Sequence, residues 1–126
     1  MNDSDLRPSV WIGHVVLETD RLRDSAEFMQ KIGMRSVHEG SEVAILELRG
    51  GTHLILARKN EVVPGTAPFD LMVDDLHQAH RLFTSLGLQP TAIEAIPDAG
   101  HELFTIQEPA GHVISVYSSH VDGRPV

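Results

Sequence analysis

Hydrophobic positions at the start of the chain change from a strand pattern to a helix pattern. Residues 10–18 are β-branched and apolar at both parities, which is typical of a strand buried on both faces. Apolar residues then recur at helical spacing from Leu22 to Ile32, after Asp20, which can cap a helix. Gly33 ends this run. The pattern therefore predicts a strand followed by a helix.

A strand and a hairpin are predicted next. Residues 35–38 fit a short strand, and two apolar runs at 43–48 and 53–58 flank Gly50-Gly51. Two glycines between apolar runs are typical of a two-residue hairpin turn. The first half of the chain thus has the order strand, helix, strand, strand, strand.

The second half repeats this order after a linker. Residues 59–67 contain Pro64 and Gly65 and are predicted to form the linker. Beyond the linker, Asp74 or Asp75 can cap a helix. The strands and the helix of the second half are predicted, in chain order, at 69–73, 76–86, 90–95, 101–107 and 112–118, with residues 108–111 as the last turn.

Two constant offsets support the repeat. Gly33 recurs 54 residues later as Gly87, and Gly51 recurs 60 residues later as Gly111. The larger second offset indicates a loop insertion of about six residues in the second unit. We therefore predict one α+β domain over 1–126 made of two tandem βαβββ units. Its parts are unit one at about 9–60, the linker at 59–67, unit two at about 68–119 and a tail at 120–126.

The composition limits which kinds of molecule the chain is expected to bind. Eighteen acidic residues against ten basic residues give a formal net charge of -8, which opposes binding to nucleic acid. The absence of cysteine excludes disulfides and thiolate metal sites. The acidic start of the chain does not resemble a signal peptide, and no apolar run is long enough to span a bilayer. We expect a cytoplasmic protein with no membrane partner.

Three segments carry a family resemblance. Gly13–Leu17 with the helix up to Gly33, Val73–Leu88, and the turn Glu108–His112 occur in the order and at the spacing of known signatures. They are similar to signatures of the vicinal oxygen chelate superfamily, which includes glyoxalases, extradiol dioxygenases and bleomycin-resistance proteins. The turn resembles the Asp-Pro-x-Gly-Asn turn of that superfamily. The resemblance covers the chain from about Val10 to Ser119.

The resemblance implies a curled mixed sheet around a central cavity, helices on the outer face, and a homodimer. It also implies a divalent metal held by the first and last strands of each unit. Those positions fall here on His14, Ile55, Pro68 and Ser115. Isoleucine and proline have no side-chain donor and a neutral serine is a weak one, so only His14 is a good ligand. We therefore expect no metal cofactor.

Strand parity predicts which side chains share the cavity with His14. In unit one, His53 and Ile55 have the parity of His14. In unit two, a turn at 108–111 puts Ser115 and Tyr117 on the same face as two residues across the hairpin. The candidate ligand-binding residues are therefore His14, His53, Ile55, Glu102, Phe104, Ser115 and Tyr117. This mainly apolar set with a few polar groups suits a small organic molecule.

Each polar candidate also has a structural alternative. His14 is either a ligand contact or a hydrogen-bonded histidine, and His53 is either a substitute donor or a solvent-exposed residue near the turn. Glu102 is either a donor or base, or a solvated glutamate. Tyr117 either donates to a ligand or buries its ring. Four other histidines are predicted to be surface residues, and Trp11 is predicted to pack in the core or against a subunit; the histidines are His77, His80, His101 and His112.

Three hypotheses on function follow. The first is a metal-free protein that binds a small organic molecule, as drug-sequestering members of the superfamily do. The alternative is a metal-dependent lyase, isomerase or dioxygenase-like enzyme with a rearranged site of His14, His53 and Glu102. A third is an interaction or regulatory module without a ligand. The sequence does not decide whether the chain is an enzyme.

Overall fold

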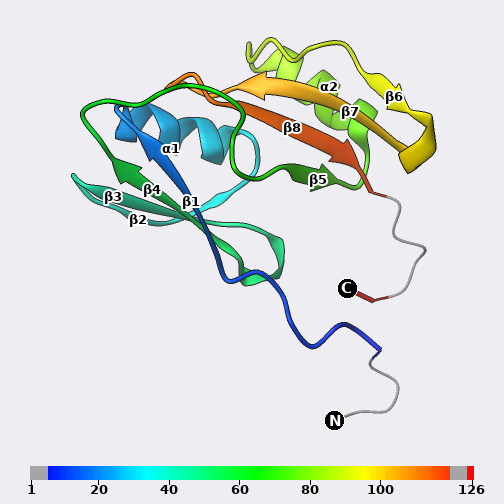
Figure 1. The fold of residues 1–126 in the computed structure, drawn as a ribbon, viewed down its shortest axis with the longest axis horizontal. Coiled ribbons are helices and arrows are strands. Elements are labelled where there is room, and N and C mark those ends of the chain that lie inside the picture. The colour runs from blue at the N-terminus through cyan, green and yellow to red at the C-terminus, as the bar shows by residue number, and fades with distance from the viewer. Residues whose placement is uncertain (1–5, 120–124) are drawn as a thin grey trace.

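The chain folds into two units with the same order of elements (Figure 1). The computed structural model describes residues 6–119 and 125–126. Unit one contains β1 (His14–Thr19), α1 (Leu22–Lys31), β2 (Arg35–Glu39), β3 (Val43–Glu47), the single turn η1 (Arg49–Gly51) and β4 (His53–Arg58). Unit two contains β5 (Leu71–Val73), α2 (Leu76–Ser85), β6 (Glu94–Ile96), η2 (Pro97–Ala99), β7 (His101–Gln107) and β8 (Val113–Ser118).

The predicted α+β class and the repeat are confirmed. Each unit forms a four-stranded mixed sheet, in the order β1-β4-β3-β2 and β5-β8-β7-β6. In both sheets the first strand pairs parallel to the last, and the other neighbours pair antiparallel. The strands form one sheet per unit, and the described strands of the two sheets are not hydrogen-bonded into a single closed sheet.

The two helices begin differently and end alike. Asp75 caps α2, as predicted, because its side chain accepts the backbone N–H of Gln78 at 3.0 Å. Asp20 does not cap α1; instead the Thr19 hydroxyl accepts the amide of Arg21 at 3.0 Å. Gly33 and Gly87 follow the helices with φ of +120° and +76°, a conformation that favours glycine.

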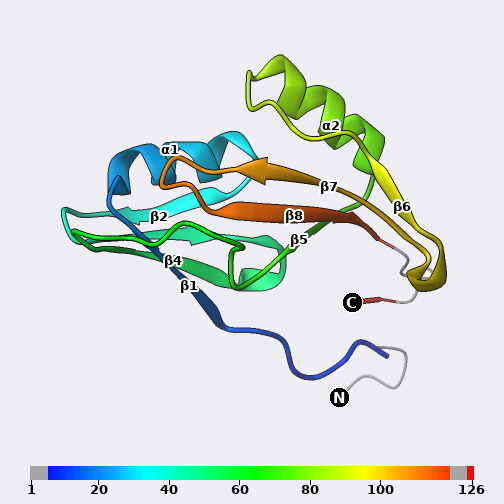
Figure 2. The same cartoon turned by 45° about the horizontal axis from the view of Figure 1, so that its top comes forward.

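Each helix covers one face of its own sheet (Figure 2). The covered faces carry the large apolar side chains of the core, because burying each one contributes about 1.5–3 kcal/mol. The opposite faces of the two sheets carry the more exposed side chains, and we call these the open faces. The core strand residues are Leu17, Ala44, Leu46, Leu54, Leu56, Phe104, Ile106, Ile114 and Val116.

The two hairpins close with the same loop, and the predicted turn lengths are wrong in both. In unit one the Leu48 amide donates to the Thr52 carbonyl at 2.8 Å, so three residues lie between that pair. In unit two the Glu108 amide donates in the same way to the His112 carbonyl at 2.9 Å. Three-residue loops of this type place a residue of positive φ last, and this residue is glycine in both hairpins.

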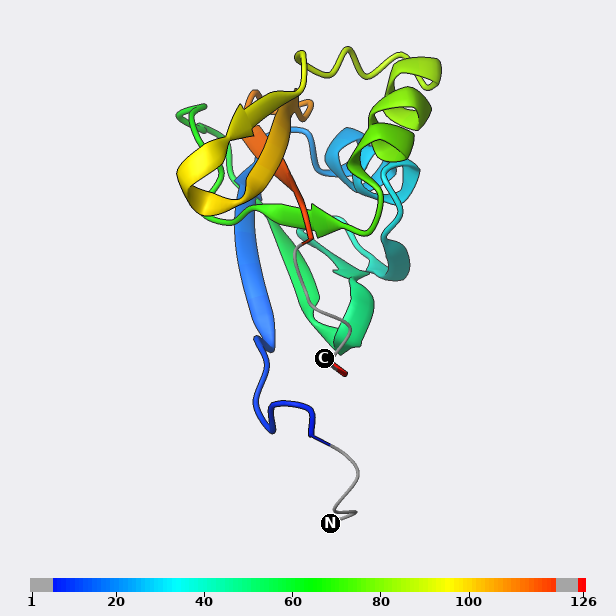
Figure 3. The ribbon, with the colours of Figure 1, turned by 90° about the vertical axis from the view of Figure 1, so that its right-hand side faces the viewer.

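The first strand begins later than predicted, and the segment before it extends away from the two units (Figure 3). Backbone pairing with β4 reaches back to Gly13, whose carbonyl accepts the His53 amide at 2.8 Å. The Ile12 carbonyl accepts the side-chain hydroxyl of Thr52 at 2.5 Å. Trp11 is 70% exposed, so packing of this residue in the core of its own chain is excluded. In the part of the chain that the structure describes, no helix combines the length and apolarity needed to cross a membrane.

Candidate functional site

Four polar side chains cross the open face of unit one at one level of the sheet. His14 on β1 pairs with His53 on β4, and His53 pairs with Glu47 on β3. Glu47 in turn pairs with Arg35 on β2. Since paired residues of neighbouring strands point to the same face, these side chains are adjacent. We call this set of His14, His53, Glu47 and Arg35 the polar row.

Contacts link each member of the polar row to the next. The rings of His14 and His53 are 5.9 Å apart between centroids and are tilted by 57°. The Nε2 atom of His53 lies 3.0 Å from a carboxylate oxygen of Glu47. The other carboxylate oxygen of Glu47 pairs with the Arg35 guanidinium. Glu47 is thus bonded on both sides, whereas His14 stands at the open end of the row.

Apolar side chains lie next to the polar row on the open face. Val16 and Ile55 pair across β1 and β4, and Ile45 pairs with Ile55 across β3 and β4. Val16 is 51% exposed, and Ile45 and Ile55 are half-buried. A small group of polar side chains on an apolar surface is the composition that ligand sites use.

The hydrogen bond between Glu47 and His53 defines the chemistry that this face can perform. A carboxylate that accepts Nε2–H leaves Nδ1 of a neutral imidazole with its lone pair. Nδ1 can then accept a hydrogen bond from a ligand or take a proton from it. The ring of His14 adds a second imidazole beside this position. The row can therefore bind hydrogen-bonding ligands, and it contains a carboxylate–histidine pair of the kind that general bases use.

The structure brings together some predicted site residues and separates others. His14, His53 and Ile55 share the open face of unit one, as predicted. Ser115 and Tyr117 lie on the open face of unit two, where the Tyr117 ring contacts the His101 ring with centroids 5.4 Å apart. The two sets of residues are therefore on different sheets.

The predicted positions of Phe104 and Glu102 are wrong. Phe104 pairs with Val116 and is buried against α2, with its ring 5.8 Å from that of Phe83. Glu102 has the same parity, and its carboxylate lies 3.4 Å from Nε2 of His77 on α2. The physical reason is the three-residue loop, because a shift of one residue in a hairpin turns every side chain to the other face.

Two of the four positions that the resemblance assigns to a metal, Ile55 and Pro68, offer no side-chain donor, and a neutral serine such as Ser115 is a weak one. Within residues 6–119 and 125–126, no three His, Asp or Glu side chains converge in a way that could hold a metal ion. The rearranged set of His14, His53 and Glu102 is not assembled either, because Glu102 contacts His77.

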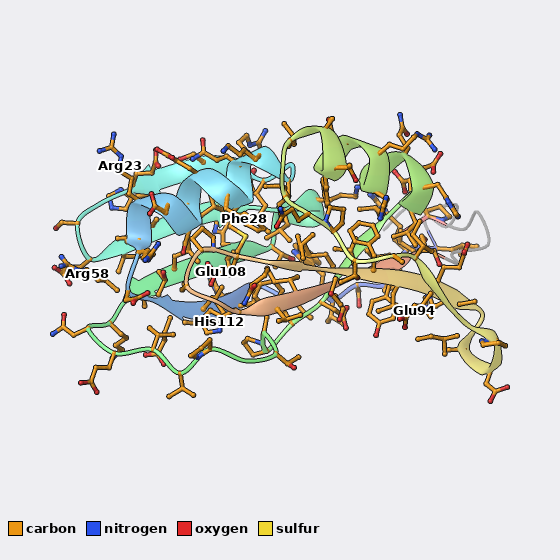
Figure 4. The ribbon with its side chains drawn as sticks, turned by 90° about the horizontal axis from the view of Figure 1, so that it is seen from above. Arg23, Phe28, Arg58, Glu94, Glu108 and His112 are labelled. Carbon is orange, nitrogen blue, oxygen red and sulfur yellow. The ribbon has the colours of Figure 1, made fainter. Side chains whose placement is uncertain are left out.

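Sequence reasoning missed a buried polar junction between the units. Glu108 is 2% exposed, and one carboxylate oxygen accepts the Ser25 hydroxyl of α1 at 2.8 Å. Its other oxygen accepts the His112 amide at 3.2 Å. His112 was predicted to be a surface residue, but it is 8% exposed and Nε2 lies 2.7 Å from the Glu18 carbonyl. Figure 4 shows Glu108 and His112 close to α1 and β1.

Three histidines of unit two that were predicted to be surface residues differ in exposure. His77 is exposed, as predicted, whereas His80 is half-buried with Nε2 2.9 Å from the Thr91 carbonyl. His101 is half-buried and its Nδ1 lies 2.8 Å from the Ser118 carbonyl. Most of the predicted tail, residues 120–124, lies outside the described residues.

Several solved protein structures are similar to this chain. No protein-family model matches the sequence, and no curated protein sequence does. A lactoylglutathione lyase from Agrobacterium tumefaciens matches with a TM-score of 0.75 at 20% identity, over 93% of this chain and 99% of that chain. The oxidase ChaP-H2 matches with a TM-score of 0.72 at 15% identity, over 94% of this chain and 100% of that chain. A bleomycin-binding protein in complex with bleomycin matches with a TM-score of 0.69 at 18% identity, over 89% of this chain and 100% of that chain.

The three structures cover 93%, 94% and 89% of this chain, so the likeness includes both units. They differ among themselves in what their names say they do, so the likeness concerns the fold. The chain therefore has the fold of the vicinal oxygen chelate superfamily.

Proposed function

We propose that the chain binds a small organic molecule on the open face of unit one without a metal ion. The observation that carries this proposal is the polar row, which lies beside the apolar side chains Val16, Ile45 and Ile55 on the open face. A buried structural network would have its donors and acceptors covered, whereas His14 is exposed at the end of the row. The bleomycin-binding protein of the same fold supports a binding role for this architecture.

We further propose that a second copy of the chain closes the site. Ligand sites bury most of the surface of a small ligand, whereas the open face of unit one is exposed in the single chain. The segment before β1 adds large apolar side chains with high exposure, which is typical of surfaces that associate. These side chains are Leu6, Val10, Trp11 and Ile12. A homodimer would cover these side chains, and the second copy would form the side of the binding site that the single chain leaves open.

The test is a binding screen combined with metal analysis of the purified protein. The probes are a library of small aromatic and heterocyclic compounds together with metal-free bleomycin, measured by thermal shift and calorimetry. We expect hits that raise the melting temperature of the wild type and bind more weakly to His53→Gln, with less than stoichiometric metal. Stoichiometric metal that survives dialysis would contradict the metal-free proposal. Hits that bind His53→Gln and wild type equally would contradict the proposed site.

A second function is supported by the hydrogen bond between Glu47 and His53. A histidine oriented by a carboxylate is suited to proton abstraction from a bound ligand, so an isomerase or lyase that uses His53 as base is the alternative. A hit that is converted to product by the wild type and bound unchanged by Glu47→Gln would favour this alternative. Binding of all hits without conversion would favour the binding protein.

A further inference from the structure

A groove of about 1010 Å³ lies between the units, away from the open face of unit one. Unit one contributes the end of α1 and the loop after β3, and unit two contributes β5 and one side of α2. The lining is mainly apolar and includes Met34, Leu48, Val73, Leu82 and Phe83. Leu82 is 51% exposed although it lies on a helix that packs against its sheet. The groove is therefore an apolar surface open to a ligand.

The other junction between the units shows why this groove exists. There, Glu108 of the β7–β8 loop contacts Ser25, the fourth residue of α1, and Ser25 contacts Thr19 at the end of β1. The equivalent residues of the second junction are Leu48 in the β3–β4 loop, Ala79 as the fourth residue of α2 and Val73 at the end of β5. All three are apolar and line the groove. Hydrogen-bonded side chains thus fill one junction, whereas the three equivalent positions of the other are apolar.

The mouth of the groove carries an excess of negative charge. The two guanidinium nitrogens of Arg49 donate to the Asp74 carboxylate at 3.1 and 2.8 Å, and Arg49 lowers the pKa of Asp74 through these bonds and its charge. Asp75 accepts the Gln78 amide, and no cationic side chain among the described residues forms an ion pair with it. Two carboxylates therefore face one guanidinium that is already engaged, in a chain of net charge -8.

We propose that the groove is a second small-molecule site, selective for an apolar ligand that carries a positive charge. The apolar body would displace water from Leu48 and Leu82, which is favourable in proportion to the area covered. The cationic end would lie at Asp75, whose carboxylate has no ion-pair partner among the described residues. A ligand with an anionic end would meet repulsion at the same position. This site is independent of the polar row.

The test compares two probes of equal chain length and opposite charge. Octyltrimethylammonium and octanesulfonate, each below its micelle concentration, are titrated into the full chain and followed by amide chemical shifts and calorimetry. We expect octyltrimethylammonium to shift amides of β5, α2 and the β3–β4 loop, and to bind about tenfold more tightly than octanesulfonate. Equal affinity of the two probes would overturn the charge preference. Shifts confined to β1 and β4 would overturn the groove site.

Two variants and a control sharpen the test. Leu82→Gln removes apolar surface without changing charge, and about tenfold weaker binding is expected. Val63→Gln makes the same kind of change at an exposed position outside the groove, and unchanged binding is expected. Asp75→Asn keeps a side chain that caps a helix while removing the charge, so it should abolish the difference between the probes. Retention of that difference in Asp75→Asn would contradict the role of Asp75, and normal binding to Leu82→Gln would contradict the site.

Discussion

The two units share one fold but differ at the last strand pair before each hairpin loop. In unit one this pair is Glu47 and His53, and in unit two it is Gln107 and Val113. His14 on β1 continues the row in unit one, whereas in unit two Val113 forms an isolated bridge with Thr66, which lies outside β5. The same backbone position thus carries an ionisable row in one unit and none in the other. Since unit two has the same fold without such a row, we infer that the row in unit one serves a function.

The junctions between the units also differ, but here the polar residue belongs to the hairpin loop of unit two. The junction at α1 is a buried polar network around Glu108, whereas the equivalent junction at α2 is an apolar groove beside Leu48. Buried polar groups stabilise a structure only when all are satisfied, and the described residues contain no buried side-chain nitrogen or oxygen without a partner. We infer that the first junction holds the units together and that the second is free to bind.

The largest effect is expected from breaking the filled junction. Glu108→Ala would leave the Ser25 hydroxyl and the His112 amide buried without their acceptor, so we expect a loss of about 3 kcal/mol in the free energy of unfolding. Leu48→Ala, the matched change in the groove, should cost about 1 kcal/mol because Leu48 is only half-buried. Urea denaturation of both variants measures the difference. Equal losses would contradict the asymmetry of the junctions.

A smaller effect is expected on self-association. Trp11→Ser should weaken the proposed dimer by about 30-fold, because exposed tryptophans are frequent hot spots of interfaces. Val63→Ser, at another exposed apolar position, is the matched control and should leave the association unchanged. Sedimentation equilibrium over a range of concentrations gives the dissociation constants. A wild-type chain that stays monomeric at all concentrations would contradict the proposal that a second copy closes the site.

Ligand affinity tests the contrast between two pairs of histidine and glutamate. His53→Gln breaks the pair on the open face, and we expect it to weaken the best hit of the screen by about tenfold. His77→Gln breaks the exposed pair with Glu102 on the helix side. Because exposed ion pairs contribute little free energy, this substitution should change the ligand affinity by less than about twofold. Calorimetric titration of the ligand into both variants measures these affinities. A larger effect of His77→Gln would move the site to unit two.

The smallest effect is expected at the ion pair between the units. Arg49 holds the pKa of Asp74 below its ordinary value, so the pair contributes at neutral pH and its contribution is lost as the pH falls through the lowered pKa. Arg49→Gln should raise the pKa of Asp74 toward its ordinary value, as measured by carboxyl carbon NMR. Arg23→Gln removes another exposed arginine, which pairs with Glu27, and should leave Asp74 unchanged. Equal Asp74 pKa values in wild type and Arg49→Gln would contradict this contact.

Sequence patterns predicted the elements well because the hydrophobic periods and the glycine stops are local. The repeat, the helix cap at Asp75 and the shared face of His14, His53 and Ile55 follow from such patterns. Arg35 and Glu47 were missed because cross-strand partners depend on the length of the loop. With the predicted two-residue turn, Leu48 would have faced His53; the three-residue loop puts Glu47 there instead.

Burial of polar groups could not be predicted in the same way. Glu108 and His112 lie in a polar turn, which by itself indicates surface. They are buried because the turn of unit two packs against α1 of unit one, a contact between segments far apart in the chain. Phe104 and Glu102 were misplaced because the loop of unit two was predicted one residue too long, whereas that of unit one was predicted one residue too short.

The most direct test of the account is imidazole NMR of the full chain with the best hit of the screen. Ring resonances are assigned by single substitutions, and the ligand is added to saturation. If the ligand lies on the polar row, the ring signals of His14 and His53 will move, and those of His77 and His80 on the helix side will not. Stationary His14 and His53 signals at full occupancy would show that the open face of unit one is not the binding site.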